Sequence, residues 1–180
     1  MFSAAQLIEA FNVCFLTRFK TVLVGGADEP LYTPSSDGVA PAIIYFRLDY
    51  PSSALHEISH WCLAGKQRRL LEDYGYWYET DSRTQQQQTL FEHVEVNPQA
   101  IECILHWAAG LPFRVSVDNL ALVDYDATPF QQSVYRQVGN YLNTGLPERS
   151  LTFAKHLLAY RLPNIDFNEF IRQQYENYSR

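Results

Sequence analysis

The sequence predicts one domain of the α/β class, of the α+β type, in which a small mixed sheet packs with several helices over residues 1–180. Three observations favour this fold. The chain has 180 residues, of which 47% are apolar and 14% aromatic, so a single domain can bury a sizeable core. Two strand patterns lie before residue 50, whereas helical spacing of apolar residues dominates the remainder. No internal repeat or linker divides the chain.

The first third of the sequence predicts one helix and two strands. From Ser3 to Phe19, apolar positions recur at helical spacing, and the Ser3 hydroxyl can cap the start. The β-branched run Thr21–Val24 predicts a short strand that stops at the glycines that follow it. A second strand, Ala42–Leu48, is almost wholly apolar and follows a loop rich in Pro and Gly.

The next helix is expected at Ala54–Ala64. The preceding residues 51–53, Pro-Ser-Ser, supply a break and a hydroxyl cap, and Gly65 supplies a stop. This helix carries the motif on which the functional prediction depends.

The second half is predicted to be mainly helical. The run Gln85–Gln88 is interpreted as the exposed side of one helix. Asn97 followed by Pro98 indicates a fresh helix start, and this helix runs toward Gly110. Val115–Val117 is a candidate strand. Three further helices are expected at about Phe130–Leu142, Ser150–Tyr160 and Asp166–Tyr178, the last opened by a capping box of Asp166 and Glu169.

Charge and composition exclude several classes of function. A net charge of −6 and a pI near 5.3 argue against broad capture of nucleic acid and favour a basic partner. The three cysteines are far apart in apolar helical contexts, which indicates reduced thiols. Residues 1–19 have the pattern of neither a signal peptide nor a membrane span. We therefore expect a cytoplasmic protein that contacts neither membrane nor nucleic acid directly.

The helix at Ala54–Ala64 contains a metal-binding pattern. Residues 56–60 read His-Glu-Ile-Ser-His, so His56 and His60 project from one helix face and can bind one cation. Either histidine alone would be more typical of a satisfied core residue. The pair is followed directly by apolar Trp61–Leu63, which can shelter a metal from bulk water.

A catalytic site on two histidines needs a third protein ligand from elsewhere. In one class of zinc peptidases that ligand is a His six residues after the second histidine, but here this position is Lys66. The best downstream candidates are Glu92, His93 and Glu95. We choose Glu95 because it lies between two valines and beside the predicted helix start, and a buried carboxylate needs a partner.

The resulting set, His56, His60 and Glu95, is compatible with two kinds of enzyme. Two histidines and one carboxylate form the facial triad of non-haem Fe(II) oxygenases, and they equally form the ligand set of thermolysin-like zinc enzymes. In a zinc hydrolase, Glu57 would be the general base that activates a metal-bound water. The residues alone leave both alternatives open, with a metal-free interaction domain as a third.

At this point the sequence resembles the elongation factor P hydroxylases, which act on the lysylated lysine of that translation factor. The likeness spans roughly residues 7 to 160, and the C-terminal tail carries none of it. The resembling blocks are Asp28–Pro30, Ala54–Cys62, Tyr74–Tyr78, Val94–Val96 with Pro98–Ala100, Ala108–Gly110, Val115–Ser116 with Asp118–Leu120, and Gly145–Arg149.

The resemblance implies an activity and its cofactors. It implies post-translational hydroxylation of the lysylated lysine of elongation factor P, with that factor as the partner. It implies Fe(II) held by His56, His60 and Glu95, with molecular oxygen as cosubstrate, although Zn or Ni can occupy such a site. It also implies an α/β fold resembling a metal-dependent bacterial endoribonuclease that processes ribosomal RNA.

Several roles stay open on this reading. Trp61, Tyr76 and Trp77 are candidate walls of the substrate site, although aromatic residues more commonly form core. In a hydroxylase, Glu57 could orient a ligand, bind the ammonium groups of the substrate or simply complete the helix. The alternative function is a zinc-dependent hydrolase, either a peptidase or an endoribonuclease. That ribonuclease type holds its metal with three histidines, and this chain offers no third His close after His60.

Overall fold

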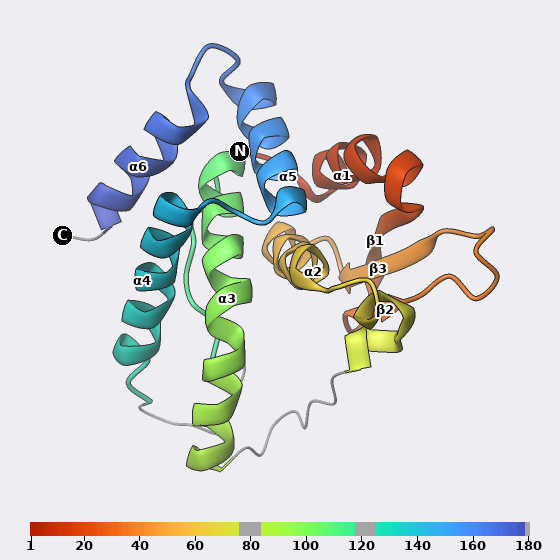
Figure 1. Ribbon diagram of the computed structural model, residues 1–180, viewed down its shortest axis with the longest axis horizontal. Helices are drawn as coiled ribbons and strands as arrows, with labels where there is room; N and C mark the ends of the chain where they lie inside the picture. Colours follow the sequence, from red (N-terminus) through yellow and green to blue (C-terminus); the bar gives the residue numbers. More distant parts are fainter. Residues whose placement is uncertain (76–83, 118–124, 179–180) are drawn as a thin grey trace.

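The computed structural model describes residues 1–75, 84–117 and 125–178, and within these ranges it confirms the predicted α+β class (Figure 1). A small mixed sheet lies at one side of the molecule, and most of the helices lie on the other side. The likeness to the ribonuclease fold stays a prediction. The elements are α1 (Ala4–Phe19), β1 (Thr21–Ala27), β2 (Leu31–Thr33), β3 (Ala42–Arg47), α2 (Pro51–Leu63), the 3₁₀ turns η1 (Arg68–Leu70) and η2 (Glu72–Gly75), α3 (Gln85–Ala109), α4 (Thr128–Thr144), α5 (Glu148–Arg161) and α6 (Phe167–Tyr178).

The sheet has the order β1-β3-β2, with β1 parallel and β2 antiparallel to the central strand. β1 does not stop at Val24, as the sequence predicts, but continues through both glycines to Ala27 with a shift of register. Gly25 is needed there because an added Cβ would lie 2.7 Å from the ring of Phe46. The glycine therefore permits close packing inside the strand rather than ending it.

Helix α2 begins at Pro51, three residues earlier than predicted, because proline suits the first helical turn. Neither serine after it caps the helix. The Ser53 hydroxyl instead accepts a hydrogen bond from the Arg47 backbone N–H at 3.0 Å and ties the end of β3 to the helix. At the other end, the Arg149 guanidinium donates to the carbonyls of Trp61, Cys62 and Ala64 at 2.6–2.9 Å. A residue of α5 thus satisfies the last carbonyls of α2.

The predicted helix start at Asn97 and Pro98 is wrong. One helix, α3, begins after Thr84, whose side chain forms a capping box with Gln87, and continues through Pro98 to Ala109. Proline removes one hydrogen bond from the helix interior. Packing of α3 against α2, α4 and α5 stabilises the helix across that gap.

The three C-terminal helices are confirmed, with ends within two residues of the predicted ones. The Asp166 side chain accepts from the Glu169 backbone N–H at 2.9 Å, as a cap should. Val115–Val117 is not assigned as a strand, whereas the short strand β2 has no sequence prediction behind it. In the described ranges, no helix combines the length and apolar character needed to cross a membrane.

The core centres on Trp61, which has no exposed surface. Its ring lies 4.9 Å from that of Phe15, 5.2 Å from Phe11 and 5.5 Å from Phe19, measured between ring centroids. These contacts join α2 to α1, while the opposite side of α2 faces α3. The core therefore fixes the direction in which α2 presents its polar face.

Candidate metal centre

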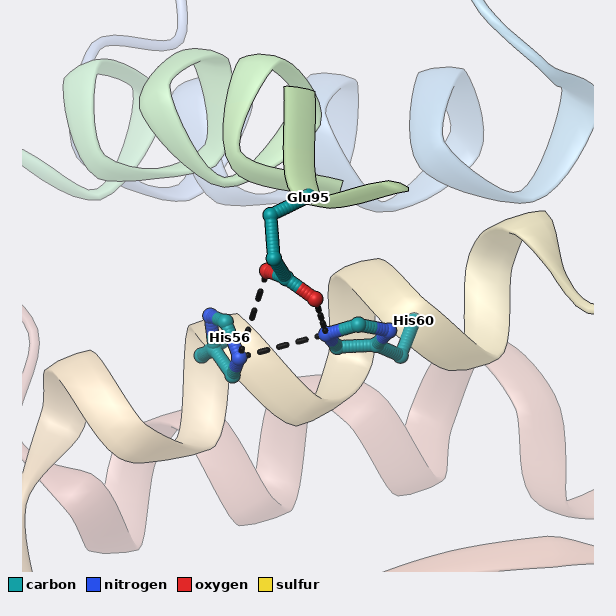
Figure 2. A group of neighbouring side chains, drawn as sticks. All are labelled: His56, His60 and Glu95. Atoms are coloured by element: carbon teal, nitrogen blue, oxygen red, sulfur yellow. Dashed lines mark hydrogen bonds and ion pairs between the residues drawn. The ribbon is translucent and has the colours of Figure 1, made fainter. Parts of the chain in front are cut away.

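Three side chains from two helices converge between α2 and α3 (Figure 2). The His60 Nε2 atom lies 3.2 Å from His56 Nε2 and 3.3 Å from Glu95 Oε1, and His56 Nε2 lies 3.9 Å from Glu95 Oε2. The two histidines come from successive turns of α2, as their spacing predicts, and Glu95 reaches across from α3. The exposed fraction falls from 27% for the His56 side chain to 12% for His60 and 2% for Glu95.

The donor atoms fit a divalent transition metal. An ion about 2.1 Å from each donor places two donors roughly 3.0 Å apart at right angles and roughly 3.4 Å apart in a tetrahedron. The two shorter separations match these values, and the longest needs only a small side-chain movement. Two imidazoles and one carboxylate suit iron, zinc or nickel, and three protein ligands leave coordination positions open.

The charges of the cluster suit a cation. Burial opposes ionisation of Glu95, but the neighbouring His60 and His56 outweigh it and lower the pKa of Glu95 to about 2. Burial likewise opposes protonation of His56, but the carboxylates of Glu102 and Glu95 raise the pKa of His56 to about 10. In the metal-free protein, the proton on His56 therefore offsets the charge of the buried carboxylates, and a bound metal would take over that role.

A second layer of side chains surrounds these three. The Glu102 carboxylate lies 2.9 Å from His56 Nδ1, the ring nitrogen that points away from Glu95. The Gln99 amide donates to Glu95 at 3.4 Å and to the Ser116 carbonyl at 2.8 Å, and its oxygen accepts from the Ser116 N–H at 3.0 Å. Gln99 thereby links the segment at Ser116 to the candidate ligand Glu95.

His106 completes this layer on α3. Its Nδ1 lies 2.9 Å from the Glu102 carbonyl oxygen, and its Nε2 lies 3.2 Å from the Ser52 hydroxyl at the start of α2. Burial lowers the pKa of His106, so the ring is neutral. A neutral ring can donate through Nδ1 and accept through Nε2, which satisfies both contacts at once.

Sequence reasoning missed Gln99, Glu102 and His106. A signal was present, because the polar residues of α3 recur at alternating intervals of four and three and so follow one helix face. All of them are buried or half-buried in the structure. The stripe consists of Gln88, Glu92, Glu95, Gln99, Glu102 and His106.

The other two candidates for the third ligand lie away from the cluster. Glu92 is half-buried and accepts hydrogen bonds from the Tyr125 hydroxyl at 2.6 Å and from the Gln88 amide at 3.2 Å. His93 is exposed on the far side of α3. Among the three candidates, only Glu95 belongs to the group of donor atoms that converge with the histidines.

The structure does not support a substrate-binding role for the predicted wall residue that it describes. Trp61 lies in the aromatic core and has no surface left for a substrate, while Tyr76 and Trp77 lie outside the described residues. Glu57 is half-buried beside both histidines, and burial raises the pKa of its carboxyl group although His56 and His60 oppose this. No described residue forms a hydrogen bond or ion pair with the Glu57 carboxylate.

Fold and site together define a class: an α+β domain with a candidate metal centre of two histidines and one carboxylate between two core helices. The family model described as elongation factor P hydroxylase matches residues 10–170. The elongation factor P lysine hydroxylase of Haemophilus influenzae (strain Rd) is 50% identical over 163 residues, which cover 91% of this chain and 92% of that protein. This chain belongs to the elongation factor P hydroxylase family.

Proposed function

We propose that this protein hydroxylates the lysylated lysine of elongation factor P, with Fe(II) held by His56, His60 and Glu95. The observation that carries the proposal is the convergence of these three donors in a chain that is 50% identical to a named elongation factor P lysine hydroxylase. Because the substrate is a translation factor, we place the reaction in the cytoplasm.

The chain's own residues prepare the site in three ways. Glu95 is ionised at any physiological pH, so it supplies a negative charge to the ion. The buried position of Glu95 and the small exposure of His60 keep bulk water from that side. When bound, the iron supplies the activation of oxygen that insertion into a C–H bond requires. The more exposed His56 side leaves an approach for the substrate.

Glu57 is our candidate for contact with the substrate. A lysylated lysine carries ammonium groups, and Glu57 presents a carboxylate without a described partner next to both candidate histidine ligands. The net charge of −6 favours the approach of such a cationic group over the whole surface. We therefore assign Glu57 to binding the ammonium groups rather than to proton transfer.

The function is tested by incubating the iron-loaded protein with lysylated elongation factor P, isotopically labelled oxygen gas and a chemical reductant. The expected result is a gain of one labelled oxygen atom on the peptide with the modified lysine, read by mass spectrometry. Unlysylated elongation factor P serves as the control substrate. No gain in the lysylated factor, from protein that holds stoichiometric iron, would contradict the proposal.

The Glu57→Gln variant separates the hydroxylase from a zinc hydrolase with the same ligands. A hydrolase loses its general base, and catalysis collapses. The hydroxylase keeps its kcat, while its KM for the lysylated factor rises because a charged contact becomes neutral. If Glu57→Gln instead loses kcat at unchanged KM, Glu57 does not bind the substrate and the assignment is wrong.

A further inference from the structure

The two candidate histidine ligands have unequal surroundings. The Nδ1 atom of His56 lies 2.9 Å from Glu102 Oε2, whereas no described residue is hydrogen-bonded to Nδ1 of His60. Both rings direct Nε2 toward the point where the donors converge. Among the described residues, a carboxylate therefore orients His56 but not His60.

We infer that Glu102 is a positioning residue that fixes the tautomer and the ring orientation of His56. An imidazole that binds a metal through Nε2 must carry its proton on Nδ1. The Glu102 carboxylate accepts that proton in a hydrogen bond and leaves the Nε2 lone pair free for the ion. A carboxylate behind a ligating histidine also increases the basicity of the ring.

Glu102 is itself held in place from two directions. Its side chain is 7% exposed, and its backbone carbonyl accepts from His106 Nδ1 at 2.9 Å. The other nitrogen of His106 meets the Ser52 hydroxyl at 3.2 Å, on the first turn of α2. His106 and Ser52 therefore tie the turn of α3 that carries Glu102 to the helix that carries His56, and this fixes the distance between the two.

This inference rests on the metal site proposed above, and it is tested with Co²⁺, a spectroscopic substitute for iron. The full chain is titrated with Co²⁺ against a competing chelator, as the parent and as Glu102→Ala and Glu102→Gln. We expect an affinity loss of up to ~100-fold for Glu102→Ala and ~10-fold for Glu102→Gln, whose amide oxygen can still accept the proton. Circular dichroism of the metal-free variants confirms that they are folded.

The matched control is Glu92→Gln. Glu92 is a half-buried carboxylate on the same face of α3, with hydrogen bonds of its own to Tyr125 and Gln88. It contacts none of the three candidate ligands. Co²⁺ affinity should therefore stay at the parent value in Glu92→Gln, and an equal loss in both variants would reduce Glu102 to a general structural role.

A second readout reports the tautomer directly. In the Co²⁺-loaded parent in water, proton NMR should show a strongly shifted Nδ1–H resonance of His56 that exchanges slowly, because Glu102 holds this proton. The resonance should disappear by rapid exchange in Glu102→Ala and persist in Glu92→Gln. If the parent binds no Co²⁺, the metal site itself is wrong. If Glu102→Ala binds Co²⁺ as the parent does and keeps the resonance, the positioning role of Glu102 is wrong while the proposed metal site stands.

Discussion

The two faces of helix α2 differ in almost every physical respect although they share thirteen residues. One face presents His56 and His60 to buried carboxylates of α3. The other presents Ile58 and Trp61, both without exposed surface, to the hydrophobic core. His60 and Trp61 are neighbours in the chain, yet a rotation of about 100° per residue directs them to different environments.

This difference separates stability from function within one helix. The core face stabilises the folded protein by removing apolar area from water. The polar face buries charges whose mutual attraction offsets their desolvation only in part, so it adds little to folding until a metal binds. Substitutions on the polar face should therefore weaken metal binding with little loss of stability. Substitutions on the core face should lower stability with little effect on function.

The largest effect is expected from removing a candidate ligand on the polar face. The His60→Ala variant should lose well over ~100-fold in metal affinity, because even residues that only support a ligand cost that much. Hydroxylation should fall to background with it. The exposed His93 of α3 gives the control, since His93→Ala should leave both unchanged. Iron bound to His60→Ala at the parent's affinity would refute the ligand assignment.

The next effect belongs to the core face. Trp61→Ala should lower the free energy of unfolding of the metal-free protein by about 3–5 kcal/mol, through a cavity between α1, α2 and α5. Urea titration measures this, and Trp61→Phe should lose less. The folded fraction should keep its KM for the lysylated factor. If Trp61→Ala is as stable as the parent and has a raised KM, Trp61 lines the substrate site, as the sequence predicts, and is not mainly a core residue.

Arg149 affects both stability and the metal site, because it binds the C-terminal end of α2, the helix that carries His56 and His60. Arg149→Lys loses the planar group that reaches three carbonyls, and we expect a loss of about 2 kcal/mol in unfolding free energy. Arg18→Lys is the control, because the Arg18–Glu148 ion pair is exposed and should matter by less than ~1 kcal/mol. An Arg149→Lys variant as stable as Arg18→Lys would show that α2 needs no support at this end.

The smallest effect is a pH dependence of the metal-free protein. The pKa of Glu95 is lowered, so its contribution is present above its ordinary value of 4.5 and is lost as pH falls toward about 2. The pKa of His56 is raised, so its contribution is present below 6.5 and is lost as pH rises through about 10. The urea midpoint in the presence of a chelator should therefore be higher between pH 4.5 and 6.5 than on either side.

The Glu95→Gln variant sharpens this test. Glu95→Gln cannot lose a carboxylate charge, so its acid limb should flatten while the alkaline limb due to His56 and Glu102 remains. An unchanged acid limb would assign that titration to other carboxyl groups.

The sequence predicted those parts of the molecule that depend on local chemistry. Ser3 caps α1 as predicted, with Gln6 completing a capping box that was not predicted, and the spacing of His56 and His60 places both on one side of α2. Each of these two features depends on a few neighbouring residues, so one sequence suffices to find it.

The choice of Glu95 drew on its two valine neighbours and on a predicted helix start at Asn97. Glu95 is buried, but Val94 is 40% exposed and α3 has no start at Asn97, so the burial of Glu95 comes from its helix face and not from these neighbours.

The remaining features depend on contacts between distant segments. Pro98 obeys no local rule, because packing on both sides keeps α3 continuous across it. The strand β2 exists only because it pairs with β3. Glu102 could be recognised only by following the polar stripe of α3, and Trp61 only by its helical register with Ile58. In both cases the decisive information is the direction of a side chain.

The cap that Arg149 places on α2 has a consequence for synthesis of the chain. The three carbonyls it satisfies lie 85 to 88 residues earlier in the sequence. A ribosome releases His56, His60 and Glu95 before it releases Arg149, the residue that completes the C-terminal end of α2. The emerging chain therefore exposes its three candidate metal ligands while the last carbonyls of α2 still lack this partner, and we expect a rigid cation site to form only when α5 docks.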